Sequence, residues 1–305
     1  MVRGACGYSW RMGEFDLIDR FFKRPARRAD LGVGDDCALL SPRPGNQLAL
    51  STDMLVEGRH FLSTADPVRL GHKCLAVNLS DLAACGAEPR AFLLSLALPR
   101  ADESWLGGFS QGLFALADAH GCELIGGDTT QGPLNISITV IGDVPRGLAL
   151  LRSGAQKGDD IYVSGTLGDA RLALEAFRGQ LRLSEAVFAR CRARMEQPTP
   201  RVALGQALRG LANAVGQISS NALQALADVL NQANALTPQL ASINAKIRAA
   251  ATPGVSAASP DLLDERDRIV GKLQELVGGT TLINEDGTAS YLLNGQHLVD
   301  REIAN

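Results

Sequence analysis

The spacing of apolar residues follows two different patterns along this chain. Up to about residue 200, short apolar runs end at glycine, proline or aspartate and alternate with stretches of helical periodicity. That order is typical of α/β or α+β domains. The pattern predicts a turn entering a strand at 31–40, strands at 47–55, 91–99, 122–132 and 134–144, helices at 14–24, 67–86 and 103–121, and a strand–turn–helix unit at 159–177.

From about residue 203 the pattern is helical without interruption. Apolar residues recur there at steps of mostly three to five residues, which predicts a long helix with a narrow apolar stripe of the kind that packs in bundles or coiled coils. Pro238 is expected to kink this helix or to begin a second one. Ser259-Pro260 then starts another helix, and Asp286-Gly287 and Asn294-Gly295 predict β-hairpins. The stripe consists of Leu211, Val215, Ile218, Leu223, Leu226, Leu230, Leu236, Leu240, Ile243 and Ile247.

Length and composition limit the class of protein. With 305 residues, 46% of them hydrophobic, the chain can form two domains. A net charge of −3 implies no general affinity for nucleic acid or anionic membranes. The chain has no apolar run of membrane-spanning length and no signal-peptide pattern near its start, and its six cysteines form no CxxC pair. We therefore expect free thiols and a cytoplasmic protein. Residues 1–12 are expected to be a non-native or disordered start, with Met12 as an alternative start of translation.

The aromatic residues and cysteines also mark a boundary. No Phe, Trp or Cys occurs after Cys191, although the chain has nine Phe and six Cys in all. The change in composition predicts a domain boundary between about 190 and 215.

Carboxylates follow strands and glycine turns in the first half, in the strings GVGDD, STD, NLSD and GGDTT. Carboxylates at strand ends, with glycines that allow close backbone approach, suit hard divalent cations such as Mg²⁺, which bridge proteins to substrate phosphates. The alternative is that each aspartate caps a turn or helix. Asp81 argues against that alternative, because it lies within an apolar helical stretch where an unpaired carboxylate is costly. The candidates are Asp35, Asp36, Asp53, Asp81 and Asp128.

Residues from about 13 to 210 resemble the thiamine-monophosphate kinase family. The stretches that carry the resemblance are GEFDLIDRFF, LGVGDDCALL, STDMLVEGRHF, KCLAVNLSDLAACGAEP, LIGGDTT, RSGAQKGDDIYVSGTLGDA and PTPRVALGQALRGLANA. The resemblance implies transfer of the γ-phosphate of ATP to thiamine monophosphate, in a fold like that of aminoimidazole-ribonucleotide synthetase. By position it implies that magnesium is bound by Asp36, Thr52, Asp53, Asp81 and Asp128, beside Ser51, that the thiamine phosphate is contacted by His60, and that ATP is contacted by Gly127 and Arg152. It also implies a homodimer formed through the N-terminal domain.

Beyond residue 210 the kinase pattern stops. The Ser-Asp-Gly and Glu-Asp-Tyr motifs that complete the family's second domain do not occur in residues 211–305. This part instead resembles an internal fragment of the flagellar hook-associated protein of the hook–filament junction, through LTPQLASINAKIRAAATPG and SPDLLDERDRIVGKLQELVGGTTLINEDGTASYLLNGQHLVD. A diverged second kinase domain is the alternative interpretation.

These patterns predict an α/β (α+β) kinase domain at 13–148, a truncated second α/β domain at 149–210, and a segment with a long helix and β-hairpins at 211–305. The expected function is thiamine-monophosphate kinase, with ATP and Mg²⁺, impaired by the missing motifs. The alternatives are a flagellar structural fragment and a non-functional fusion. Neither flagellar nor nucleic-acid partners are expected.

Overall fold

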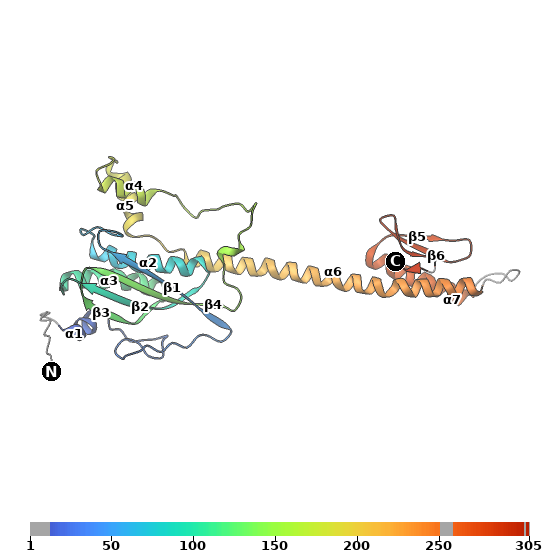
Figure 1. Ribbon diagram of the computed structural model, residues 1–305, viewed down its shortest axis with the longest axis horizontal. Coiled ribbons are helices and arrows are strands. Elements are labelled where there is room, and N and C mark those ends of the chain that lie inside the picture. Colours follow the sequence, from blue (N-terminus) through green and yellow to red (C-terminus); the bar gives the residue numbers. More distant parts are fainter. Residues whose placement is uncertain (1–12, 251–258, 302, 305) are drawn as a thin grey trace, which may run out of the picture. The chain divides into compact units, whose positions relative to one another are not determined.

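The structure is a computed structural model that describes residues 13–250, 259–301, 303 and 304. The expected non-native start at 1–12 lies outside the described residues. Two compact units divide the chain, Met1–Asn213 and Ala214–Asn305. In chain order, unit 1 contains α1 (Glu14–Phe21), β1 (Asn46–Val56), α2 (Pro67–Ala84), β2 (Glu88–Leu98), α3 (Glu103–His120), β3 (Glu123–Gln131), β4 (Asn135–Pro145), η1 (Arg152–Gly154), α4 (Asp169–Phe177) and α5 (Glu185–Glu196) (Figure 1).

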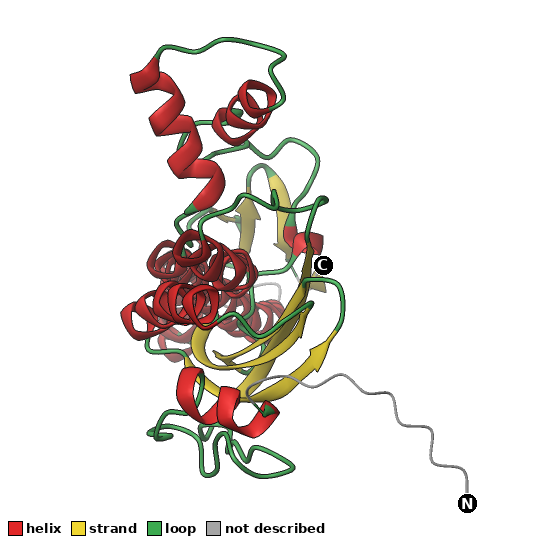
Figure 2. Cartoon of the chain, turned by 90° about the vertical axis from the view of Figure 1, so that its left-hand side faces the viewer, coloured by secondary structure: helices red, strands yellow, loops and turns green. Residues whose placement is uncertain are grey.

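A four-stranded sheet with the order β1-β4-β2-β3 forms the centre of unit 1. β4 pairs antiparallel with β1 and β2, whereas β2 and β3 are parallel. Helices α2 and α3 cover one face, and the main hydrophobic core lies between them and the sheet (Figures 1 and 2). The predicted mixture of strands and helices in this half of the chain is confirmed.

Local signals in the sequence explain where α2 and α3 begin and end. The Asp66 carboxylate accepts a hydrogen bond from the backbone N–H of Arg69, and Pro67 follows as the first helical residue. Asp102 caps α3 in the same way, and Gly121, at φ 58°, ends it in the left-handed region that glycine adopts freely.

The other face of the sheet is only partly covered. A small apolar cluster of Ala91, Ile125 and Ile141 packs there against Ala38 and Leu40 from the loop before β1. Leu50 and Met54 of β1 also point to this face and are 63% and 55% exposed. The sheet therefore has one face buried by helices and one largely open face, and β1 and β3 are its free edges.

The predicted strand within 159–164 does not form. Residues Asp159–Ser164 make no sheet pairing, and the side chains of Ile161 and Tyr162 are 93% and 87% exposed. A strand needs a neighbour to satisfy its backbone hydrogen bonds, and the described part of unit 1 offers none at this segment. The helix predicted after it is confirmed as α4.

The helix predicted from about 203 is confirmed as α6 (Val202–Ala250). Pro238 lies inside it, so of the two outcomes expected for this proline, the start of a second helix is wrong. Proline cannot donate a hydrogen bond to the carbonyl four residues earlier, here that of Asn234. The Thr237 hydroxyl donates to this carbonyl instead, at 3.3 Å. This local replacement removes part of the cost of an internal proline.

Unit 2 has its own core. It comprises the end of α6, α7 (Pro260–Val277) and an antiparallel sheet of the order β5-β6-β7-β8. Tyr291, Ile247 and Leu273 are fully buried together, and both predicted hairpins are confirmed, with Asn294 and Gly295 at φ 52° and 79°. The strands are β5 (Thr280–Ile283), β6 (Ala289–Leu293), β7 (Gln296–Asp300) and β8 (Ile303–Ala304). Within the described ranges, no helix has the length and apolar character needed to cross a bilayer.

Glycines allow α2 and α3 to approach closely. A Cβ atom on Gly112 of α3 would lie 1.8 Å from the Val68 carbonyl oxygen of α2, and one on Gly71 would lie 2.1 Å from that of Phe109. Such distances are far below van der Waals contact. Any side chain at these positions must therefore separate the two helices.

We expect Gly112→Ala to destabilise the protein by about 1–3 kcal/mol, because the added methyl group forces apart a close-packed pair of helices. Gly107→Ala is the matched control in the same helix, since its Cβ would meet nothing nearer than 3.9 Å. There alanine should stabilise by about 0.5–1 kcal/mol through helix propensity. Urea unfolding followed by circular dichroism measures both, and equal effects of the two substitutions would contradict the packing argument.

Candidate functional site

The candidate residues of β1 lie beside α2. Asp53 is on the face of β1 that is turned toward the helices, as is buried Leu55. Its backbone N–H donates to Asn78 Oδ1 of α2 at 3.0 Å, and the fully buried Asn78 donates in turn to the Cys74 carbonyl. This buried amide fixes the position of edge strand β1 against α2 and so places the carboxylate of Asp53.

Asp81 of α2 lies next to this group. The Ser51 hydroxyl donates to Asp81 Oδ2 at 2.5 Å. The pKa of Asp53 is raised, first by burial and then by the negative charge of Asp81, while His60 lowers it. A carboxylate whose pKa is raised by burial and by a neighbouring carboxylate favours a bound cation. Thr52 points to the opposite face of β1, where its hydroxyl lies 2.7 Å from that of Thr139.

His60 is held at both its ring and its backbone. The backbone N–H of Val56 donates to His60 Nδ1 at 3.0 Å, and Lys73 Nζ donates to the His60 carbonyl oxygen at 2.9 Å. With Nδ1 as acceptor, the neutral ring carries its proton on Nε2, which is then available to a ligand. Burial lowers the pKa of Lys73. Its hydrogen bond to the His60 carbonyl oxygen anchors the loop that carries the histidine.

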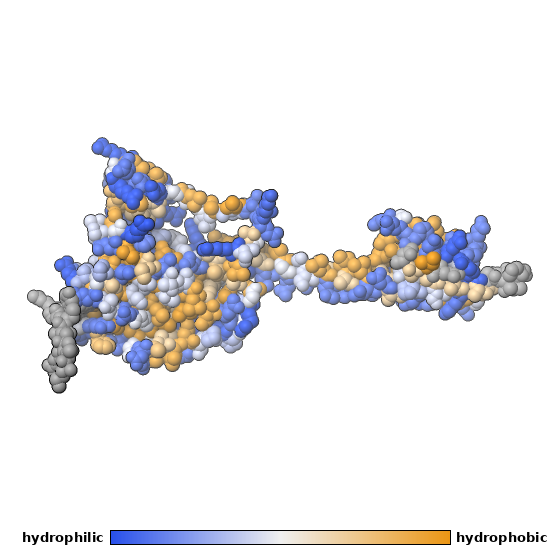
Figure 3. Space-filling view, in the orientation of Figure 1, coloured by the Kyte–Doolittle hydropathy of each residue, from blue (hydrophilic) through white to orange (hydrophobic). Residues whose placement is uncertain are grey.

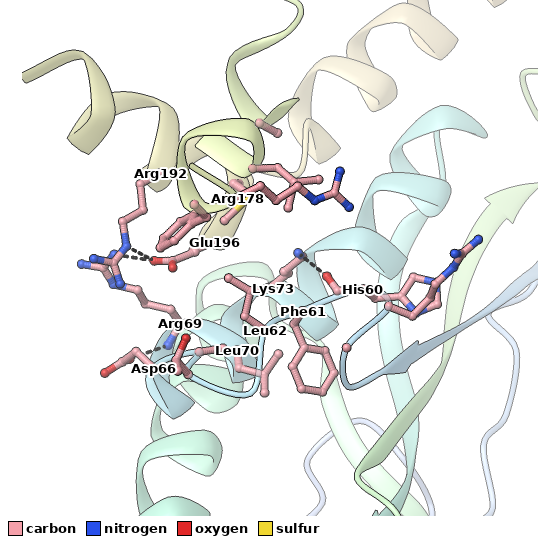
Figure 4. Close-up of a pocket in the computed structure, with 18 of the residues that line it drawn as sticks. His60, Phe61, Leu62, Asp66, Arg69, Leu70, Lys73, Arg178, Arg192 and Glu196 are labelled. Atoms are coloured by element: carbon pink, nitrogen blue, oxygen red, sulfur yellow. Dashed lines mark hydrogen bonds and ion pairs between the residues drawn. The ribbon is translucent and has the colours of Figure 1, made fainter. Parts of the chain in front are cut away.

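A cavity of about 420 Å³ opens beside His60, between the start of α2 and the helices α4 and α5 (Figure 4). Its size is in the range of small-molecule sites. Apolar side chains line part of it, and six cations surround them. The apolar residues are Phe61, Leu62, Leu70, Leu174, Phe177 and Met195; the cations are Arg59, Arg69, Lys73, Arg171, Arg178 and Arg192.

Acidic side chains neutralise some of these cations. Glu196 accepts from Arg69 at 2.6 Å and from Arg192 at 2.9 Å (Figure 4). Glu175 pairs in the same way with Arg171 and Arg178. With two glutamates shared among four arginines, the cavity keeps an excess of positive charge and suits a ligand with an apolar ring and an anionic group.

Asp128 and Gly127 lie far from Asp53. They are on β3, the opposite edge of the sheet, three strand spacings or about 14 Å away. Asp128 aligns with Ser95 of β2 and belongs to the open face. Gly127 is required by packing alone, because at φ 150° its Cβ would lie 1.8 Å from the Leu94 carbonyl oxygen.

The other two candidates stand apart as well. Asp36 is exposed in the loop before β1. The same loop carries Ala38, and its Cβ lies 3.8 Å from the position that a Cβ atom would take on Gly126 of β3. Arg152 is exposed in η1, beyond Leu150, whose N–H donates to the Cys85 carbonyl at the end of α2. Arg152 lines neither the cavity nor the Asp53–Asp81 group. Among the described residues, no three His, Cys, Asp or Glu side chains converge on one metal position.

The structure brings together Asp53, Asp81 and His60, which the sequence also singles out, and adds two supports that the sequence analysis missed. Asn78 and Lys73 each stand in the apolar helical stretch LGHKCLAVNLSDLAA. A polar residue in such a stretch is a signal of a buried partner. The arginines of α4 and α5 gave no comparable signal, since they lie on segments with many charged residues.

Two family models match the chain. Residues 34–144 match the N-terminal domain of AIR synthase related proteins. Residues 193–305 match the flagellar hook-associated protein FlgK helical domain.

Known proteins match the chain over longer stretches than these family models do. The thiamine-monophosphate kinase of Salmonella typhimurium is 48% identical over 222 residues, which are 72% of this chain and 68% of that protein. The crystal structure of thiamine-monophosphate kinase from Stenotrophomonas maltophilia K279a is 48% identical with a TM-score of 0.58, and the match covers 65% of each chain. A structure of AaThiL complexed with AMPPCP and TMP is 31% identical with a TM-score of 0.51, over 65% of this chain and 63% of that one. The chain thus spans just under two thirds of these solved kinases.

We expect Asp53→Asn to raise the melting temperature in metal-free buffer, by up to about 2 °C. Because burial and Asp81 raise the pKa of Asp53, the folded chain binds this proton more tightly than the unfolded chain does. Stability is therefore lost as the pH rises through the folded pKa, and asparagine removes that loss.

The effect should be present at pH 7.5 and vanish near pH 3, below the unfolded pKa. Calorimetry at both pH values measures it, with exposed Asp160→Asn as the control. An equal or lower melting temperature of Asp53→Asn at pH 7.5 would refute the carboxylate pair.

Proposed function

The chain belongs to the thiamine-monophosphate kinase family, and we propose that it transfers the γ-phosphate of ATP to thiamine monophosphate, giving thiamine diphosphate. One observation supports this most directly: a pair of adjacent carboxylates, Asp53 and Asp81, beside a histidine at a cationic cavity of small-molecule size. Phosphoryl transfer needs mainly positioning and offset of negative charge, and little covalent chemistry from the protein. No residue is assigned as an acid, base or nucleophile.

The donor set on β1 and α2 fits magnesium. Mg²⁺ prefers oxygen ligands and commonly binds one or two carboxylates together with substrate phosphates. Asp53 and Asp81 supply two carboxylates. Thr52 is also proposed as a ligand, but its hydroxyl is on the opposite face of β1, beside that of Thr139. Bound magnesium supplies positive charge that offsets the charge of the transferred phosphoryl group. We propose Asp36 and Asp128 as further ligands, although they lie at the other edge of the sheet.

A homodimer through the N-terminal domain accounts for that separation. The sheet has free edges at β1 and β3 and a partly apolar open face. Pairing of two such sheets would cover Leu50 and Met54 and remove the free edges, which proteins seldom leave exposed. It also allows β3 of one copy, with Asp128, to approach β1 of the other, with Asp53.

The cavity is the proposed site of thiamine monophosphate. Apolar side chains such as Phe61 and Phe177 offer a surface to its rings, and the excess of cations suits its phosphate. His60 Nε2–H is placed to donate to that phosphate. ATP is proposed to contact Gly127 and Arg152, with Gly127 contributing backbone atoms only. The activity is proposed to be cytoplasmic.

The rate is proposed to be lower than in full-length relatives. Residues 211–305 contain no Ser-Asp-Gly or Glu-Asp-Tyr motif, and the solved kinases extend well beyond the part that this chain matches. Loss of even one preorganised donor typically costs about two to three orders of magnitude in rate. The second candidate function, a flagellar structural fragment, is favoured by the match of residues 193–305 to the FlgK helical domain. A fusion without function is the third.

The test is formation of thiamine diphosphate by the purified chain with ATP, Mg²⁺ and thiamine monophosphate. We expect turnover on the order of 10²–10³-fold below that of a full-length relative, and its loss in Asp53→Asn but not in Asp160→Asn. Turnover equal to that of the relative would contradict the proposed impairment. No turnover from protein with a native circular dichroism spectrum would contradict the kinase function.

We expect Lys73→Met to weaken binding of thiamine monophosphate about tenfold, because the His60 loop loses its anchor while the buried methylenes are kept. Calorimetric titration without ATP measures this separately from turnover. Exposed Lys157→Met is the matched control for loss of one positive charge. Equal affinities of Lys73→Met and Lys157→Met would show that Lys73 does not position the site.

A further inference from the structure

The part of α6 that belongs to unit 2 carries an apolar stripe with no covering element in the described residues. Val215, Ile218, Leu223, Leu226 and Leu230 recur at helical spacing, and their side chains are 58%, 70%, 64%, 55% and 49% exposed. Figure 3 shows apolar side chains gathered along this helix. A helix with such a stripe normally packs against another helix.

The same stripe becomes buried further along the helix. Ala233, Thr237 and Leu240 continue it at steps of three and four residues, and they are 5%, 7% and 0% exposed. There, α7 and the small sheet cover it in the second hydrophobic core. The exposed stripe thus continues a packed interface toward the N-terminal end of α6. The elements α7 and the small sheet cover the helix from Ala233 onward and leave Leu230 and the residues before it uncovered.

The charges beside the stripe do not favour a partner helix of different sequence. Between Arg209 and Lys246, Asp228 is the single charged residue, and the remaining polar positions are Asn, Gln, Ser and Thr. Helix pairs that select a different partner usually do so with charges beside the stripe. A neutral, alanine-rich flank instead permits close approach of an identical helix, because it sets no like charges against each other.

The order of residues in the stripe is close to a palindrome. Counted from the midpoint between Ala222 and Leu223, Val215 and Leu230 are equally distant, and Ile218 and Leu226 differ by one residue. When two copies of this helix lie antiparallel about that midpoint, Val215 meets Leu230 of the other copy, and Ile218 lies one residue out of register with Leu226. Alanine at the centre leaves room for the Leu223 side chain of the second helix.

We propose that residues 215–230 form an antiparallel helix pair with the same segment of a second copy of this chain. The pair buries ten large apolar side chains, five from each copy. Five apolar side chains from each copy are far fewer than the roughly 20–30 residues a side of a standard interface, so we expect weak, micromolar association. The inference is independent of the proposed kinase activity and of pairing through the N-terminal domain.

The first test is sedimentation equilibrium of the full chain from about 1 to about 100 µM, a range that brackets micromolar association. We expect the average mass to rise with concentration. The double variant Ile218→Gln/Leu226→Gln should show a smaller rise, because it can no longer pair through the stripe. The matched control is Ser220→Gln/Asn231→Gln, on exposed positions outside the stripe, which should behave as wild type. An unchanged mass profile in the stripe variant would overturn the proposal.

The second test reads the orientation of the pair. In an antiparallel pair, Ala222→Cys brings two cysteines together at the centre, whereas two copies of Val215→Cys lie about 22 Å apart along the axis. We expect a disulfide-linked dimer of Ala222→Cys and none of Val215→Cys, each in a background without Cys6, Cys37 and Cys85. Equal cross-linking of both variants indicates a parallel pair and overturns the proposed register; cross-linking of neither overturns the pairing itself.

Discussion

The close contact of α2 with α3 on one side and β1 on the other is the constraint on which the candidate site depends. Gly71 and Gly112 let the two helices approach to backbone contact, which sets the position of α2 on the sheet. From this helix Asn78 holds β1, Asp81 meets Ser51, and Lys73 holds the His60 loop. A shift of α2 would therefore displace Asp53, Asp81 and His60 together, since each of them is positioned by a contact with this helix.

Both units leave apolar surface that a packed domain would normally cover. In unit 1 the segment around Ile161 and Tyr162 is extended and exposed without a sheet to join, and in unit 2 the α6 stripe is bare over residues 215–230. Exposed apolar patches of this kind favour association between molecules. The compact parts of the chain have complete cores of their own, while the segments between them do not.

The sequence was sufficient for elements with strong local signals. The helix end predicted at 121 and the Asn294-Gly295 hairpin are present in the structure, and Asp66 and Asp102 cap the helices predicted at 67–86 and 103–121. Sequence reasoning failed at 159–164, where the segment has strand-forming residues but no neighbouring strand, an outcome that depends on distant parts of the chain. At Pro238 the outcome is local: α6 continues, and the Thr237 hydroxyl donates to the carbonyl that the proline cannot reach. For the site, family resemblance identified Asp53, Asp81 and His60, but strand order, which no local pattern reveals, separates Asp128 from Asp53.

Gly127 belongs to a sequence motif that the resemblance assigns to ATP, and it is also required by the packing of the sheet. Its backbone lies so close to the Leu94 carbonyl that no side chain fits, whatever role the residue has toward a nucleotide. In a saturation screen that selects for growth without thiamine, every replacement at this position would be scored as deleterious through loss of folded protein. Genetic intolerance at Gly127 is thus a measure of sheet geometry, and the contribution of this turn to nucleotide recognition is better assessed through its neighbours Asp128 and Thr129.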